Sequence, residues 1–153
     1  MHILLSNDDG YQAPGLKALL ESTKEHGEIT VVAPDENKSG ASGSLTLSKV
    51  LTVKASGERC FAVDGTPVDC VHIGLNGLLD NEPDMVISGI NSGSNLGDDV
   101  LYSGTVGAAL EGRRLAYPGV AVSLVGSEPK HYWTAGQVAS AIVSELKINP
   151  LPS

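Results

Sequence analysis

Residues 1–10 are MHILLSNDDG, a short apolar run that stops at a cluster of turn-forming residues. The run at 2–6 has the length and composition of a buried strand, and residues 7–10 are typical of the turn that follows one. The sequence therefore predicts a chain that opens with a strand inside a sheet. Two carboxylates, Asp8 and Asp9, then lie at the carboxyl end of that strand.

The rest of the chain alternates strand patterns with helix patterns. Further strands are expected at 29–33, 84–88 and 120–125, with a hairpin formed by 50–54 and 59–63. Helices are expected from Pro14 to Gly27, from Pro67 to Leu79, and at 105–116 and 133–147. This alternation implies a three-layer, Rossmann-like α/β fold, in which helices cover both faces of a mostly parallel sheet. We expect residues 1–153 to form a single domain.

Composition is that of an ordinary globular protein, with 41% hydrophobic and 18% charged residues among 153. Ten basic and eighteen acidic side chains give a net charge of -8, which disfavours binding to a nucleic-acid duplex. No apolar run approaches the roughly 18 residues of a membrane span. The first residues lack the basic region of a signal peptide, and Cys60 and Cys70 form no metal-binding pattern. We therefore expect a cytoplasmic protein with reduced cysteines.

Three polar loops, at 7–10, 34–44 and 89–104, each follow an expected strand. In open parallel sheets, ligands bind beyond the carboxyl ends of the strands. We therefore expect the three loops to converge and to form the functional site.

The pair Asp8-Asp9 is the sharpest local feature. Two adjacent carboxylates are costly to hold ionised close together, so a cation that neutralises them would explain their presence. The alternative is that residues 7–10 were selected only for the backbone conformations of a turn. The tetrapeptide alone leaves both interpretations open.

The second and third loops offer groups that suit an anion. Ser39 and Gly40 supply a hydroxyl and exposed backbone amides, although a plain surface loop has the same composition. Ser103, Gly104 and Thr105 precede an expected helix, whose first N–H groups and positive dipole end favour phosphate. Ser103 also suits an ordinary helix N-cap. Neither a Walker A pattern nor GxGxxG is present, which excludes the common P-loop and dinucleotide sites.

Other polar residues have structural interpretations. Asp69 lies in the first turn of the helix that begins at Pro67, where a carboxylate interacts favourably with the helix dipole. The four histidines lack the spacing of a zinc site, and we expect them to be structural or exposed.

Together, these segments resemble the SurE (survival protein E) family. The resemblance rests on four motifs in the same order: residues 6–10 (SNDDG), 33–35 (APD) with 39–40 (SG), 65–71 (GTPVDCV), and 88–91 (SGIN) continuing to 102–106 (YSGTV). It covers essentially the whole chain. Family members are longer, and their carboxyl part carries an arm used in oligomerisation, so this chain corresponds to the N-terminal portion of a family chain.

The resemblance implies a metal-dependent 5'-nucleotidase that hydrolyses nucleoside monophosphates, and in some members polyphosphate. The family's metal ligands correspond to Asp8, Asp9, Ser39 and Asn91. It also implies one divalent cation per subunit and assembly into a homodimer or homotetramer.

Chemistry supports the same site. Carboxylate, hydroxyl and amide oxygens suit Mg²⁺ or Mn²⁺ rather than zinc. Such an ion would polarise a phosphoryl oxygen and activate water, and Asp8 or Asp9 would take the proton. Gly40, Asn95 and the helix start at residues 103–105 would bind the phosphate.

Two non-catalytic classes remain as alternatives. One is a receiver-type signalling domain, which also has an acidic pair after its first strand. It requires a phosphoacceptor Asp and a Lys at later strand ends, and both are missing here. The other is a protein that binds a nucleotide or phosphate without turnover, which the sequence does not distinguish from an enzyme.

Overall fold

The computed structural model describes residues 1–126 and 130–151, and a six-stranded sheet lies at its centre. The strands are in the order β3-β4-β2-β1-β5-β6, and all pairings are parallel except that of β3 with β4. Their bounds are β1 (His2–Ser6), β2 (Glu28–Pro34), β3 (Val53–Gly57), β4 (Cys60–Val63), β5 (Met85–Ser92) and β6 (Val120–Leu124).

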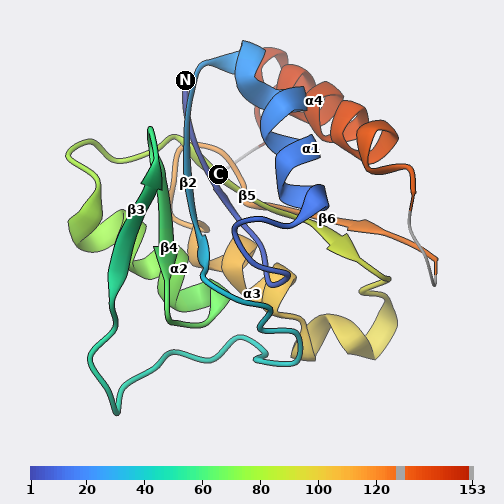
Figure 1. Ribbon diagram of the computed structural model, residues 1–153. Helices are drawn as coiled ribbons and strands as arrows, with labels where there is room; N and C mark the ends of the chain where they lie inside the picture. The colour runs from blue at the N-terminus through green and yellow to red at the C-terminus, as the bar shows by residue number, and fades with distance from the viewer. Residues whose placement is uncertain (127–129, 152–153) are drawn as a thin grey trace.

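Helices cover both faces of this sheet (Figure 1). On one face α1 packs against α4, and on the other α2 packs against α3. The helical segments are α1 (Pro14–Thr23), η1 (Lys24–His26), α2 (Pro67–Ile73), η2 (Gly74–Leu78), η3 (Gly97–Tyr102), α3 (Gly104–Glu111) and α4 (Tyr132–Ile148). The predicted three-layer α/β fold is therefore confirmed. Among residues 1–126 and 130–151, no helix is long and apolar enough to cross a membrane.

Strand β1 is buried on both faces because its side chains alternate between two cores. Ile3 and Leu5 pack in the core beneath α1 and α4, whereas Leu4 packs in the core beneath α2 and α3. All three are fully buried. Because neither face of a central parallel strand meets water, apolar residues are favoured at every position, which explains the continuous apolar run at the start of the chain.

Several element boundaries differ from those predicted. The hairpin is at 53–57 and 60–63, because Val50 is 90% exposed and contributes no strand side chain. The helix expected at 105–116 ends at Glu111, and the one expected from Pro14 to Gly27 ends in a 3₁₀ turn at His26. The helix from Pro67 ends as a π-helical segment at Leu78.

The largest difference is in the third polar loop. Strand β5 continues past Ser88 to Ser92, and residues 97–102 form a 3₁₀ helix. The strand continues because Ile90 is fully buried in the core beneath α1. The β5–β6 register shifts between Ser88 and Asn91, and Gly89 there has φ +145° and faces the carbonyl of Val122. A side chain at residue 89 would have neither the conformation nor the space it needs.

The topology places a crevice between β1 and β5. Strands β2 and β5 pair with β1 from opposite sides, so the chain changes direction across the sheet at this point. In doubly wound sheets, such a switch point is where ligands bind. Of the predicted site residues, Asp8 and Asp9 follow β1 and Asn91 lies near the end of β5.

Candidate active site

A cavity of about 300 Å³ lies at this switch point. Its walls come from all three polar loops: Asp8 after β1; Ser39 and Gly40 after β2; and residues 91–95, 99 and 102–104 from the end of β5 to the start of α3. The predicted convergence of the loops is therefore confirmed. A larger cavity of about 480 Å³ lies beside Leu16 and Cys60 but contains none of the predicted site residues.

Most predicted site residues line this cavity, and two do not. Asp9 and Thr105 are absent from its walls, whereas the others contribute to it: Asp8, Ser39, Gly40, Asn91, Asn95, Ser103 and Gly104. Asp9 and Thr105 are instead hydrogen-bonded to residues of that wall. Each of them forms a hydrogen bond that positions a residue in the cavity wall, as described below.

Asp8 is the deepest charged group of the site, with 5% of its surface exposed. Its Oδ1 accepts a hydrogen bond of 2.8 Å from the hydroxyl of Thr105, which is itself fully buried. Burial raises the pKa of the Asp8 carboxyl, the bond from Thr105 opposes this rise, and the charge of Asp9 adds to it. A raised pKa means that the ionised form lacks a compensating positive charge in the protein itself.

Asp9 connects the first loop to the other two. One carboxylate oxygen accepts from the backbone N–H of Ser92 at 3.0 Å, and the other accepts from the side-chain amide of Asn37 at 3.4 Å. In addition, the N–H of Lys38 donates to the carbonyl of Asp8 at 2.7 Å. The acidic pair is thus the common hydrogen-bonding partner of the second and third loops.

The turn at 7–10 is also a well-formed turn in its own right. The Asn7 side chain accepts from the N–H of Gly10 at 3.2 Å and donates to the carbonyl of Gly10 at 2.9 Å. Turn formation thus explains Asn7 and Gly10, but it uses neither carboxylate. The two aspartates need a separate explanation, and their position at the cavity supplies one.

Two asparagines of the third loop are held by their amide nitrogens. Asn91 donates to the carbonyl of Gly93 at 3.0 Å, and Asn95 donates to the hydroxyl of Ser123 at 2.7 Å. These bonds orient the amides and leave each side-chain oxygen for another partner. Asn91 is 9% exposed, so its oxygen is a nearly buried acceptor at the cavity wall.

The start of α3 forms another wall. The Ser103 hydroxyl accepts from the N–H of Val106 at 3.1 Å, which confirms Ser103 as the N-cap. The N–H groups of Gly104 and Thr105 belong to the first turn, where no helical carbonyl pairs with them. A Cβ at Gly104 would lie 3.3 Å from the Cβ of Asp8, a tight contact, so glycine lets the helix start approach the carboxylate without displacing either group.

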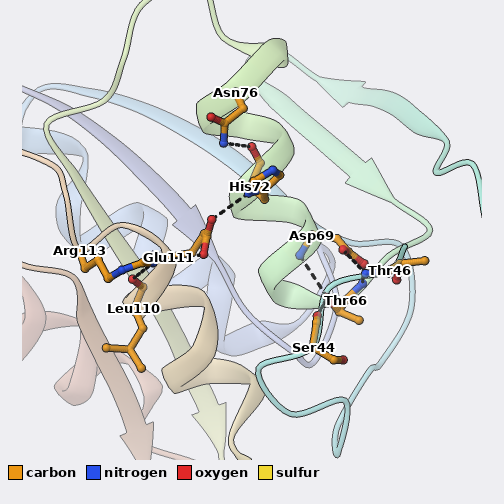
Figure 2. Close-up of polar contacts among 9 residues, drawn as sticks. All are labelled: Ser44, Thr46, Thr66, Asp69, His72, Asn76, Leu110, Glu111 and Arg113. Atoms are coloured by element: carbon orange, nitrogen blue, oxygen red, sulfur yellow. Dashed lines mark hydrogen bonds and ion pairs between the residues drawn. The ribbon is translucent and has the colours of Figure 1, made fainter. Parts of the chain in front are cut away.

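The chain that follows the second loop is held in place by Asp69, as Figure 2 shows. This carboxylate is 2% exposed and accepts from the N–H of Thr46 at 2.8 Å, from its hydroxyl at 2.6 Å and from the N–H of Thr66 at 2.8 Å. The hydroxyl of Thr66 donates to the carbonyl of Ser44 at 2.7 Å. The structural role expected for Asp69 is confirmed, and it extends beyond α2 to the loop that carries Ser39.

The charges of the cavity suit a cation. Asp8 and Asp99 line it, and none of its described wall residues is Lys, Arg or His. Within residues 1–126 and 130–151, no three His, Cys, Asp or Glu side chains come together as a metal site. A cation here would therefore use hydroxyl and amide oxygens beside carboxylate oxygens, a donor set that fits Mg²⁺ or Mn²⁺.

Sequence reasoning missed Asp99 as a wall residue, together with Ser92, Gly93 and Ser94, and it named Tyr102 only as one of three tyrosines that could contact a base. Asp99 is one of two adjacent aspartates in η3, and only its position three residues before Tyr102 distinguishes it from Asp98. In a 3₁₀ helix, residues three apart lie on the same face, so this spacing is a signal once the 3₁₀ helix is known.

Comparison with known proteins agrees with the motifs. A family model described as Survival protein SurE matches residues 3–151. Two relatives named 5'-nucleotidase SurE, from Alkalilimnicola ehrlichii and Methylococcus capsulatus, are 59% and 58% identical to this chain over 153 residues. The matched region is the whole of this chain, but only 60% and 61% of the two relatives. The crystal structure of a SurE protein from Aquifex aeolicus superposes with a TM-score of 0.93 at 44% identity, covering 99% of this chain and 62% of that one.

The chain thus spans about 60% of the length of the curated relatives it matches. The model match, the identity over the whole chain and the shared fold all point to the same group of proteins. The chain belongs to the SurE family.

Proposed function

We propose that this chain forms the catalytic core of a metal-dependent 5'-nucleotidase, which hydrolyses nucleoside monophosphates to nucleoside and phosphate. The observation that carries the proposal is the cavity itself. It brings a buried carboxylate, an amide oxygen and a helix start together, with no cationic side chain among its described wall residues. The name 5'-nucleotidase SurE of the relatives agrees with such a site.

In this proposal one Mg²⁺ or Mn²⁺ is held by Asp8, Asp9, Ser39 and Asn91. The raised pKa of Asp8 and the oriented amide of Asn91 support this set, because both groups have acceptor oxygens in need of a positive partner. Bound there, the ion would neutralise phosphate charge and lower the pKa of a water molecule. It would also remove the repulsion that a chain of net charge -8 exerts on a phosphate ester.

The phosphate group is bound by the helix start and the facing loops. The first N–H groups of α3, at Gly104 and Thr105, are donors for phosphate oxygens, and the Ser103 hydroxyl lies beside them. Gly40 and Asn95 line the same cavity from the other loops. These donors are held by the fold before the substrate arrives, which is the arrangement that stabilises charge as it develops.

Water attacks phosphorus in line with the leaving nucleoside oxygen, the bond from phosphorus to that oxygen breaks, and that oxygen takes a proton from solvent as the nucleoside leaves. Asp8 or Asp9 accepts the proton that the attacking water loses. Asp8 lines the cavity and Asp9 does not, which favours Asp8 for this role. Thr105 positions Asp8 through the hydrogen bond of 2.8 Å.

Three further points belong to this proposal. The same phosphate contacts would accept the end of a polyphosphate chain. The family resemblance supports a homodimer or homotetramer. Both cysteines are free thiols, as expected in the reducing cytoplasm, where we place the protein.

Release of inorganic phosphate from AMP tests the proposal. We expect release with Mn²⁺ or Mg²⁺, none with EDTA, and almost none from Asp8→Asn in either condition. Asp80→Asn is the matched control, because Asp80 is exposed and lies beside His2 and Glu28 at the opposite end of the strands. AMP binding without phosphate release would instead identify a binding protein, and full activity of Asp8→Asn would refute the assigned site.

A further inference from the structure

The 3₁₀ helix η3 presents one face to the cavity. It runs from Gly97 to Tyr102 and buries none of its residues. Asp99 and Tyr102 line the cavity, whereas Val100 and Leu101, between them, do not. Residues three apart in a 3₁₀ helix lie on the same side, so the two side chains form one continuous surface.

Tyr102 is the one aromatic residue among the described residues that line this cavity. It is 70% exposed, in a chain in which aromatic residues make up only 4%. Its position is immediately before Ser103, the N-cap of α3. An aromatic ring therefore lies next to the helix start that binds phosphate in the proposed function.

Asp99 adds a hydrogen-bond acceptor on the same surface. Its side chain is exposed, and no hydrogen bond or ion pair involving its carboxylate is found among the described residues. A carboxylate in the wall of the same cavity can accept hydrogen bonds from the hydroxyls of a ribose, as a carboxylate does in dinucleotide sites.

We propose that this face of η3 binds the nucleoside part of the substrate. Tyr102 stacks on the base and Asp99 accepts hydrogen bonds from the ribose hydroxyls. The inference rests on the proposed function, because it takes the phosphate position from it. It assigns the specificity of the site to a segment separate from the residues that would hold the cation.

The cavity-facing side of η3 also explains why the site should discriminate little among bases. An aromatic ring stacks on every base, since each base has a π-face. The described wall residues include two carboxamide side chains: Asn91, which belongs to the proposed cation site, and Asn95, whose amide nitrogen is bonded to Ser123 so that mainly its oxygen is left for a base edge. The site should therefore favour nucleotides over simple phosphate esters while it discriminates little among bases.

Binding of AMP and of ribose 5-phosphate, with Mn²⁺ present, tests the role of Tyr102; it is measured as KM where phosphate is released and by calorimetry where it is not. In wild type, AMP should bind about 10- to 100-fold more tightly than ribose 5-phosphate. Tyr102→Ala should abolish most of this ratio, and Tyr102→Phe should retain it. Leu101→Ala is the matched control, because Leu101 is 74% exposed on the same helix but does not line the cavity. An unchanged ratio in Tyr102→Ala would overturn the proposal.

The role of Asp99 is tested with AMP and 2',3'-dideoxy-AMP. Asp99→Ala should lower the preference for AMP by about tenfold, the value of one charge-assisted hydrogen bond. Asp98→Ala should leave the preference as in wild type. An equal preference in Asp99→Ala and wild type would refute the assignment.

Binding also separates this inference from the proposed function. If the wild-type protein binds AMP but releases no phosphate, the nucleotidase proposal fails while the ratios above still decide the nucleoside surface. If phosphate is released but Tyr102→Ala and Leu101→Ala show the same AMP to ribose 5-phosphate ratio, the nucleotidase proposal stands and the nucleoside surface is wrong.

Discussion

Replacing Asp69 by alanine should destabilise the protein, although Asp69 does not line the cavity. The carboxylate accepts three hydrogen bonds, of 2.8, 2.6 and 2.8 Å, from Thr46 and Thr66, and only 2% of the residue is exposed. Alanine would remove the capping box of α2 and leave two backbone N–H groups without their acceptor. A lost cap costs about 1 kcal/mol and each buried unpaired group about 1–3 kcal/mol. Because the threonines are partly accessible to water, we expect a total loss of about 2–4 kcal/mol.

The loss should depend on pH. Burial raises the pKa of Asp69, but the hydrogen bonds from Thr46 and Thr66 more than offset burial and lower the pKa below its usual value. A carboxyl with a lowered pKa in the folded state stabilises the fold above its unfolded pKa of about 4. That contribution disappears as the pH falls through the folded pKa. The difference between wild type and variant should therefore be largest at neutral pH and shrink below pH 4.

Urea denaturation followed by circular dichroism, at pH 7, 5 and 3, measures both effects. Thr46→Val is the graded control, since it removes only the hydroxyl bond and should cost about 1 kcal/mol. A free energy of unfolding for Asp69→Ala within about 0.5 kcal/mol of wild type at pH 7 would refute the reasoning. So would a difference that stays constant from pH 7 to pH 3.

Three other predictions concern the candidate site. A hundredfold excess of Mn²⁺ over its Kd should raise the free energy of unfolding by about 2.7 kcal/mol in wild type and by much less in Asp8→Asn. Without metal, Asp8→Asn should be at least as stable as wild type, and thermal melts with EDTA and with Mn²⁺ measure both differences. Purine and pyrimidine monophosphates should differ by about tenfold or less in kcat/KM, on the order of 1.4 kcal/mol, and a thousandfold preference in steady-state assays would reveal an additional base pocket. Gly104→Ala should weaken Mn²⁺ binding in calorimetry, because the new Cβ would lie 3.2 Å from Pro67 and 3.3 Å from the Cβ of Asp8. Unchanged affinity would show that the helix start can shift away from Asp8.

The central sheet could be predicted from the sequence because its signals are local. An uninterrupted apolar run such as Ile3 to Leu5, followed by turn residues, identifies a strand without knowledge of its neighbours. The extension of β5 to Ser92 could not be predicted in this way. Gly89 resembles a loop residue in the sequence, but the strand continues past it, with a shift in register, because Ile90 is buried beneath α1. That contact is tertiary, so no local pattern records it.

The candidate site also has some features that local sequence signals predict and others that depend on tertiary contacts. Convergence of the loops follows from the rule on strand ends, so Asp8, Ser39 and Asn91 could be predicted to share one region. The bond between Thr105 and Asp8 joins residues 97 positions apart, and nothing in the sequence indicates that the Thr105 side chain points toward Asp8. Helix η3 has no buried residue, and hence no apolar period from which its cavity-facing side could be inferred.

The pairing of β1 with β5 also has a consequence for how the protein folds. Ile3 pairs with Met85, so most of the chain must be brought into a closed loop before the two strands meet. Such non-local pairings form slowly, because the entropy of loop closure is lost before the contacts compensate for it. Local elements such as α1 can form earlier, while Asp8 and Asn91 are still far apart. Affinity for a cation should therefore arise late in refolding, after most helical circular dichroism has been regained.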